Sequence, residues 1–407
     1  MQYSSFVLDN GLRIIHLHSD SPVSYCGYVV QAGTRYEKPN QNGLAHFVEH
    51  MLFKGTEKRK ARHILNRMES VGGEINAYTT KEETFLYVVC LQEDIERAIE
   101  LLSDLIFNSK FPETEIEKER EVVIDEIHSY EDTPSDLIFD EFENMLFAGN
   151  ELGHSILGDV ESLQNFTSDS CKDFNKDYYR PENMVFFSYG KTPVSKILRY
   201  IEKYSQNNSS LVSTQNLRLN PELIPAKTII KNKNLHQTHV VSGGKAYSMF
   251  DKKRMGLLLL TNILGGPGMN SRLNVSLREK YGLVYTVDAE IISYSDTGVY
   301  TVYFGCDSES MEQCLHLMRK ELKNLRDKKL SGSQFTAAVK QWKGQIGIAS
   351  EHKENVALRL GKNYLHFNNY DSLPQTYQKI DAITAESLLE IANEIYEEKQ
   401  MFSLIYQ

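Results

Sequence analysis

The chain has 407 residues, of which 41% are hydrophobic and 25% charged, so it has the composition of a globular protein with room for two or three domains of roughly 100–200 residues. No apolar run approaches the roughly 20 residues of a transmembrane helix, which argues against membrane insertion. The formal net charge of −10 disfavours nucleic acid as a partner, because a surface that follows phosphates needs an excess of positive charge.

The N-terminal stretch and the cysteines indicate the cellular compartment in which the protein is expected. Residues 1–9 have neither the basic start and apolar core of a signal peptide nor the arginine-rich character of a transit sequence. The five cysteines are odd in number and never spaced as CxxC, which argues against a disulfide framework and against a thiolate zinc site. We expect a cytoplasmic protein of bacterial type, although a mature organellar form trimmed of its targeting segment would look the same.

The first chemically distinctive element is a helix predicted over residues 43–53, which Asn42 could cap. It carries His46, Glu49 and His50. Since residues three and four apart share one side of a helix, both imidazoles and the carboxylate should project from the same face. Two neutral imidazoles suit zinc, and a nearby carboxylate can take a proton from a water activated there. The alternative is a solvated helix on which these residues coincide.

A hairpin and an amphipathic helix are predicted next. A strand-like stretch runs from Gly72 to Tyr78, a polar turn covers residues 80–83, and residues 84–89 alternate as a strand. An acidic start then leads into an amphipathic helix over residues 94–107, judged by apolar residues that recur at three and four positions.

A second helix offers the carboxylate that two histidines lack. Residues 114–117 have the form of a capping box, so a helix should begin there. Glu119 and Glu126 are seven residues apart and therefore lie on one face of it. One of them could reach a metal while the other supports a histidine ligand. The alternative is an ordinary charged helix surface.

The polar, aperiodic segment around residues 206–226 predicts a linker between two domains, residues 1–205 and 227–407. The order of elements in the first half recurs after it: helix, two strands, helix, at residues 257–264, 284–292, 299–304 and 310–325. Short strands with helices packed on them indicate an α+β fold made of two homologous domains. The alternative is that two unrelated α+β domains share this coarse pattern.

The run from Gly43 to Thr56, with its His-x-x-Glu-His order, strongly resembles the pitrilysin-type family of zinc peptidases, the inverzincins. The resemblance is closest to the branch that includes the mitochondrial processing peptidase and its small bacterial relatives. In this family a distal Glu-x6-Glu pattern completes the metal site. Glu119 and Glu126 match the pattern, with Glu126 lying 76 positions after His50.

The resemblance implies a role for each residue of the site: His46, His50 and Glu126 bind zinc, Glu49 is the general base, and Glu119 supports the ligands from behind. It also implies substrate contacts. Asn76 and Ala77 should lie on the edge strand that pairs with an extended peptide. Arg278 and Tyr285 match the family's Arg-x6-Tyr pair, which can stabilise developing negative charge from across a cleft.

The second half lacks the metal-binding residues. Its corresponding helices offer leucines, Asn262 and Gly265 in place of the histidines, and alanines, Gln341 and Gln345 in place of the glutamates. We therefore expect one zinc per chain, in an α+β protein whose two domains form half of a clamshell.

The family further implies short or unfolded peptide substrates and either a homodimer or a heterodimer with an inactive homologous subunit. Rival interpretations are a dedicated presequence-processing peptidase and a non-catalytic subunit of the core-protein type.

Overall fold

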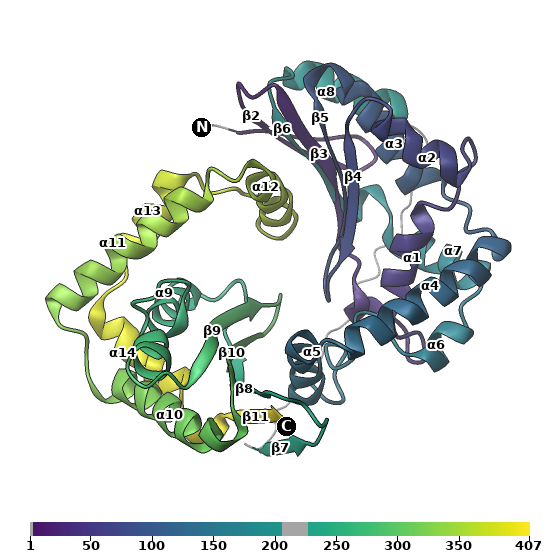
Figure 1. Cartoon of the computed structure of the whole chain (residues 1–407). Coiled ribbons are helices and arrows are strands. Elements are labelled where there is room, and N and C mark those ends of the chain that lie inside the picture. The colour runs from purple at the N-terminus through teal and green to yellow at the C-terminus, as the bar shows by residue number, and fades with distance from the viewer. Residues whose placement is uncertain (1–2, 206–226) are drawn as a thin grey trace. The chain divides into compact units, whose positions relative to one another are not determined.

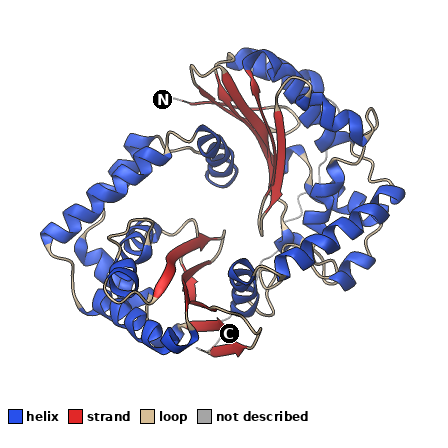
Figure 2. Cartoon of the chain, viewed as in Figure 1, coloured by secondary structure: helices blue, strands red, loops and turns tan. Residues whose placement is uncertain are grey.

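The computed structural model describes residues 3–205 and 227–407, so the predicted linker at 206–226 lies outside the described residues. The described residues form two compact units. The first contains residues 3–129, 154–205 and 349–372, and the second contains residues 130–153, 227–348 and 373–407. Each unit is a sheet with helices on it (Figure 2), as the α+β prediction requires.

The first unit is built on a six-stranded sheet in the order β1-β2-β6-β3-β5-β4. All neighbouring strands are antiparallel except β2 and β6, which are parallel. The strands are β1 (Tyr3–Val7), β2 (Arg13–His18), β3 (Val23–Val30), β4 (Glu74–Thr79), β5 (Thr84–Leu91) and β6 (Met184–Gly190). Strand β6 is buried along its whole length and rich in aromatic residues, which pack well on a pleated surface.

Helices cover one face of this sheet. They are α1 (Leu44–Leu52), α2 (Ala61–Glu69), α3 (Ile95–Asn108), α4 (Glu113–Glu131), α6 (Val160–Gln164), α7 (Ser168–Tyr178) and α8 (Val194–Tyr204). Alternate residues of β6, Met184 and Phe186, join the core under these helices, and the intervening Val185 and Phe187 join a second core on the opposite face. The metal motif therefore lies on α1, one of the helices on this face (Figure 1). The apolar side of α1 is anchored in the larger core.

The second unit repeats this topology. Its five-stranded sheet has the order β7-β11-β8-β10-β9, and only β7 and β11 are parallel. The strands are β7 (Thr228–Lys231), β8 (Thr238–Ala246), β9 (Val284–Ser293), β10 (Gly298–Cys306) and β11 (Phe402–Tyr406). The helices on the sheet's larger core are α9 (Arg254–Gly265), α10 (Met311–Asp327), α11 (Gly332–Ala349) and α14 (Ala385–Ile395), and α13 (Leu373–Asp381) follows α12 in the chain. Strand for strand, this is the order β2-β6-β3-β5-β4, which agrees with the expectation of two homologous domains.

Each half of the sequence contributes one helix to the other unit. The predicted division at residues 206–226 does not include this exchange. Helix α5 (Pro134–Leu146) comes from the first half but packs Ile138 and Phe142 against the free face of the second sheet. Helix α12 (Lys353–Phe367) comes from the second half but packs Leu360 and Tyr364 on the free face of the first sheet. An amphipathic pattern shows that a helix has an apolar face but not which sheet covers it.

Candidate metal centre

The metal-motif helix α1 begins differently from the prediction. Its N-cap is Gly43, and Asn42 makes no capping bond to the helix. Instead, the carboxylate of Glu37 accepts hydrogen bonds from the backbone N–H groups of Gly43 (2.9 Å) and Ala45 (2.7 Å), and it lies 2.9 Å from Nε2 of His154. Glu37 lies six positions before the N-cap, and it performs the capping function that an Asn, Asp, Ser or Thr at the N-cap itself usually has. The carboxylate also complements the positive end of the helix dipole.

Helix α4 also begins one residue earlier than expected. It starts at Glu113, directly after Pro112, so Thr114 lies inside the first turn and does not cap the helix. The backbone N–H groups of Glu115 and Ile116 bond to the carbonyl of Pro112. The predicted register of the glutamates is unaffected, because the helix still runs through Glu126.

His46, His50 and Glu126 converge. One ligand atom from each lies within 4.8 Å of the other two, with Oε2 of Glu126 lying 3.8 Å from Nε2 of His46 and 3.6 Å from Nε2 of His50. Ligands about 2.0–2.2 Å from a tetrahedral zinc are themselves about 3.3–3.5 Å apart, so small side-chain adjustments suffice. Two imidazoles and a carboxylate are a typical donor set of catalytic zinc sites. In the described part of the chain, no other such cluster of three is found.

Glu119 orients His50 from behind. Its Oε1 lies 2.9 Å from Nδ1 of His50, which leaves Nε2 as the ring nitrogen directed at the cluster. Glu119 is only 4% exposed and also forms an ion pair with Lys54, a partner that the sequence did not suggest. Burial works to raise the pKa of Glu119, but the hydrogen bonds with His50 and Lys54 outweigh it and lower the pKa. Glu119 is therefore an ionised carboxylate that fixes the imidazole.

The two histidines differ in their environment. Burial lowers the pKa of His46 to about 3, so this imidazole is neutral, as a metal ligand must be. Burial works against protonation of His50 as well, but the hydrogen bond with Glu119 and the charges of Glu49 and Glu126 raise its pKa.

Glu49 is buried beside the cluster, only 7% exposed, and burial raises its pKa to about 7. Its Oε2 accepts a hydrogen bond of 3.1 Å from the hydroxyl of Thr79 at the end of β4. Sequence reasoning did not assign a role to Thr79. The two-residue period of a strand offered a signal, because Ala77 and Thr79 share one face of β4.

The predicted substrate-contacting residues fall in both units. Asn76 and Ala77 lie on β4, the last strand of its sheet, which pairs with β5 and with no other described strand. In the second unit Arg278 lies in the short π-helical segment η4 (Asn274–Glu279) and Tyr285 near the start of β9. The Arg278 guanidinium lies 5.8 Å from the Tyr285 ring centre, and Tyr285 is 81% exposed. Their contact with a substrate stays a prediction.

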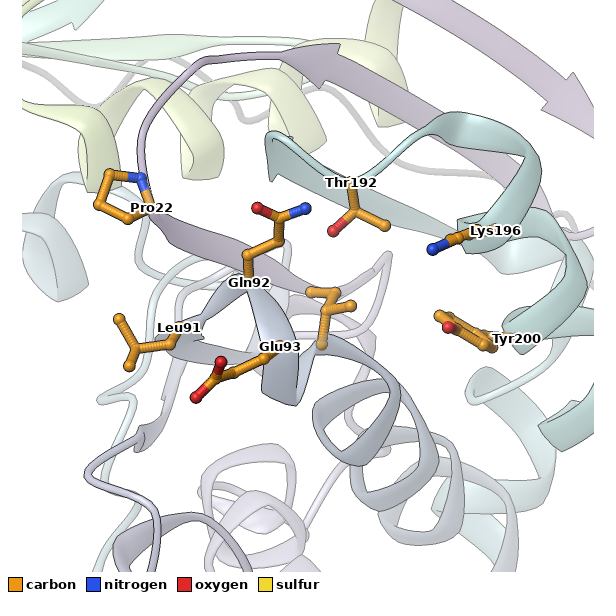
Figure 3. A pocket seen from close by; sticks show the side chains of 8 residues that line it. Pro22, Leu91, Gln92, Glu93, Thr192, Lys196 and Tyr200 are labelled. Atoms are coloured by element: carbon orange, nitrogen blue, oxygen red, sulfur yellow. The ribbon is translucent and has the colours of Figure 1, made fainter.

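An open pocket of about 430 Å³ lies elsewhere in the first unit (Figure 3). It is lined by Pro22, Leu91, Gln92, Glu93, Ile95, Thr192, Lys196 and Tyr200. None of these is a residue of the histidine cluster, so the pocket is separate from the candidate metal centre.

Comparison with known proteins agrees with the geometry. Residues 13–160 match the family described as Insulinase (Peptidase family M16), and residues 165–342 match the Peptidase M16 inactive domain. The chain is 31% identical over 401 residues to the zinc protease YmxG of Bacillus subtilis, an alignment that covers 98% of this chain and 97% of that protein. The chain belongs to peptidase family M16. The predicted family resemblance is therefore confirmed, and zinc is the family's metal.

Further relatives place the chain within this family. It is 28% identical over 398 residues to the human mitochondrial-processing peptidase subunit beta, covering 94% of this chain and 80% of that protein. A solved protease structure from Helicobacter pylori superposes with a TM-score of 0.91 at 21% identity, covering 100% of this chain and 99% of that one. An M16 inactive-domain structure from Pseudomonas fluorescens gives a TM-score of 0.92 at 18% identity, with coverages of 100% and 98%. These structures confirm the two-domain fold.

Proposed function

We propose that the protein is a zinc-dependent endopeptidase in which His46, His50 and Glu126 bind one zinc per chain. The observation that carries this assignment is the convergence of three ligand atoms within 4.8 Å beside a buried carboxylate, Glu49, on the same helix. The hydrogen bond between Glu119 and His50 supports it, because a carboxylate behind a histidine ligand is typical of zinc sites.

Each residue of the proposed site has its own role in peptide hydrolysis. Zinc held at this site would make a water molecule more acidic and polarise the scissile carbonyl. Glu49 accepts the proton of the attacking water and then delivers it to the leaving amine. Its pKa of about 7 lies near neutrality, where a group can both accept and release a proton, and a bound cation would lower that pKa. Arg278 and Tyr285 would stabilise the negative charge that develops on the carbonyl oxygen.

The substrate class follows from the edge strand. An extended peptide can add to the free side of β4 and hydrogen-bond with the backbone of Asn76 and Ala77. A peptide that pairs in this way must be extended with free backbone N–H and C=O groups, which favours short or unfolded peptides. The likeness to a processing-peptidase subunit favours, as a second candidate, the removal of presequences. In either case we expect a homodimer or a heterodimer with an inactive homologous subunit.

The test is metal analysis combined with digestion of an unstructured peptide by the wild type and by Glu49→Gln. We expect one zinc per chain in both proteins and a fall of about a hundredfold or more in kcat for the variant. Glu117→Gln, on the exposed side of α4, is the matched control and should cleave normally. A wild type without zinc, or a fully active Glu49→Gln, would refute the mechanism.

Peptide sets distinguish the two candidate functions. Arginine-rich presequence peptides should be compared with unrelated peptides of equal length. Equal turnover of both sets supports general oligopeptide cleavage, whereas cleavage confined to the presequences supports a processing peptidase.

A further inference from the structure

The hydroxyl of Thr79 contacts the carboxylate that we propose as the general base. Thr79 Oγ1 lies 3.1 Å from Oε2 of Glu49 and 3.4 Å from Oγ1 of Thr84. The Thr84 hydroxyl already donates to the carbonyl of Ala32, at 2.6 Å. Thr79 is therefore left to donate, and the carboxylate oxygen of Glu49 is the nearer of its two acceptors.

This hydrogen bond occupies one oxygen of the carboxylate. Glu49 reaches the cluster from α1, whereas Thr79 reaches it from β4, so the bond ties a helix to a strand. With Oε2 held by Thr79, Oε1 is the oxygen left to accept a proton from water. A base that is held in one reactive rotamer transfers protons faster than a base that must first rotate into that rotamer in each turnover.

The segment that carries Thr79 is fixed by its surroundings. The turn after β4 contains Thr80, Lys81, Glu82 and Glu83, of which the three charged residues are at most 4% exposed. Backbone bonds join Thr34 to the carbonyl of Thr80 and Arg35 to the carbonyl of Lys81, and Arg35 pairs with Glu82 at 2.8 Å. The sequence predicted an ordinary polar turn, but the structure places it inside the protein.

We propose that Thr79 is a positioning residue that holds Glu49 in the orientation needed to accept the water proton. The inference rests on the proposed function of Glu49. It does not make Thr79 a catalytic residue, since its hydroxyl acts through the glutamate.

Two substitutions separate the hydroxyl from the shape of the side chain. Thr79→Val keeps the β-branched shape and removes the donor, whereas Thr79→Ser keeps the donor. We expect kcat to fall about tenfold to a hundredfold in Thr79→Val, the effect of losing one hydrogen bond to a charged group. KM and zinc content should stay within about twofold, and Thr79→Ser should recover most of kcat.

The control is another buried threonine of the same unit. Thr192 is 4% exposed, lines the separate pocket of Figure 3, and its hydroxyl has no hydrogen-bond partner among the described residues. Thr192→Val should therefore leave kcat unchanged. In a Glu49→Gln background, Thr79→Val should cause no further loss, because the group that it positions is gone.

The outcomes distinguish this inference from the proposed function. If Glu49→Gln is inactive but Thr79→Val retains full kcat, only the positioning role fails. If Thr79→Ser is as slow as Thr79→Val, packing and not the hydroxyl is responsible, and the inference is again refuted. If Glu49→Gln is fully active, the proposed function itself fails.

Discussion

The buried carboxylate of Glu83 holds the exchanged helix α12 in the first unit. Its Oε1 lies 2.5 Å from Nε2 of His366 and its Oε2 lies 3.2 Å from Nζ of Lys362, both on α12. The side chains of Glu83 and His366 are 2% and 3% exposed. Glu83→Gln keeps the size of the side chain but removes its charge, so we predict that α12 opens more often in this variant.

The lowered pKa of Glu83 gives the size of the stabilisation that Glu83→Gln should remove. Burial works to raise this pKa, but the hydrogen bond with His366 and the charge of Lys362 outweigh it and lower the pKa from 4.5 to about 2. That difference corresponds to about 3 kcal/mol of stability at neutral pH. The usual cost of removing one partner of a buried ion pair is similar, about 3–5 kcal/mol. Because the folded pKa is depressed, this contribution is complete above about pH 4.5 and is lost as the pH falls toward about 2.

Hydrogen exchange measures the opening of α12 directly. About 3 kcal/mol corresponds to exchange about a hundredfold faster in Glu83→Gln than in the wild type for the backbone amides of residues 353–367. The ratio of the two rates should shrink at about pH 3, since intrinsic exchange rates cancel in the ratio and part of the wild-type stabilisation is gone. The exposed Glu69→Gln should leave exchange of α12 unchanged.

Two results would refute this reasoning. One is a ratio near one at neutral pH. The other is a ratio that stays the same at about pH 3, which would show that the charge of Glu83 does not stabilise the helix.

Three further predictions concern the metal centre. Glu119→Gln should weaken zinc binding about tenfold to a hundredfold, measured by competition with a chelator, whereas the exposed Glu117→Gln should not. Equal zinc affinities of the two variants would contradict the conclusion that Glu119 supports His50 as a ligand. Zinc affinity should fall as the pH drops through the raised pKa of His50, because only the neutral imidazole binds the metal. Zinc titrations at several pH values between about pH 8 and pH 5 would contradict this if they gave a constant affinity. Gly43→Ala should lower both thermal stability and zinc content, because Gly43 has a φ of 90° and a Cβ there would lie 2.6 Å from the carbonyl oxygen of Leu157. A variant with wild-type stability and zinc content would contradict this prediction.

Local patterns predicted much of the fold correctly. The hairpin of β4 and β5 and the helices α3, α9 and α10 lie within a few residues of their expected bounds. Alternation of apolar residues and helical periodicity are properties of neighbouring positions, so they can be read without knowing what packs against them. The same reasoning did not identify the partner sheets of α5 and α12, which depend on contacts between segments far apart in the chain.

The histidine motif illustrates the same division. The sequence by itself determined that His46, Glu49 and His50 share one face of a helix and that Glu119 and Glu126 share a face of another, because helical spacing decides both. Only the tertiary structure decided that the two faces meet, that Glu37 and not Asn42 caps the motif helix, and that Thr79 contacts Glu49. The physical reason is that these contacts join residues separated by 6 to 80 positions, whose proximity depends on the packing of helices and strands and not on local conformation.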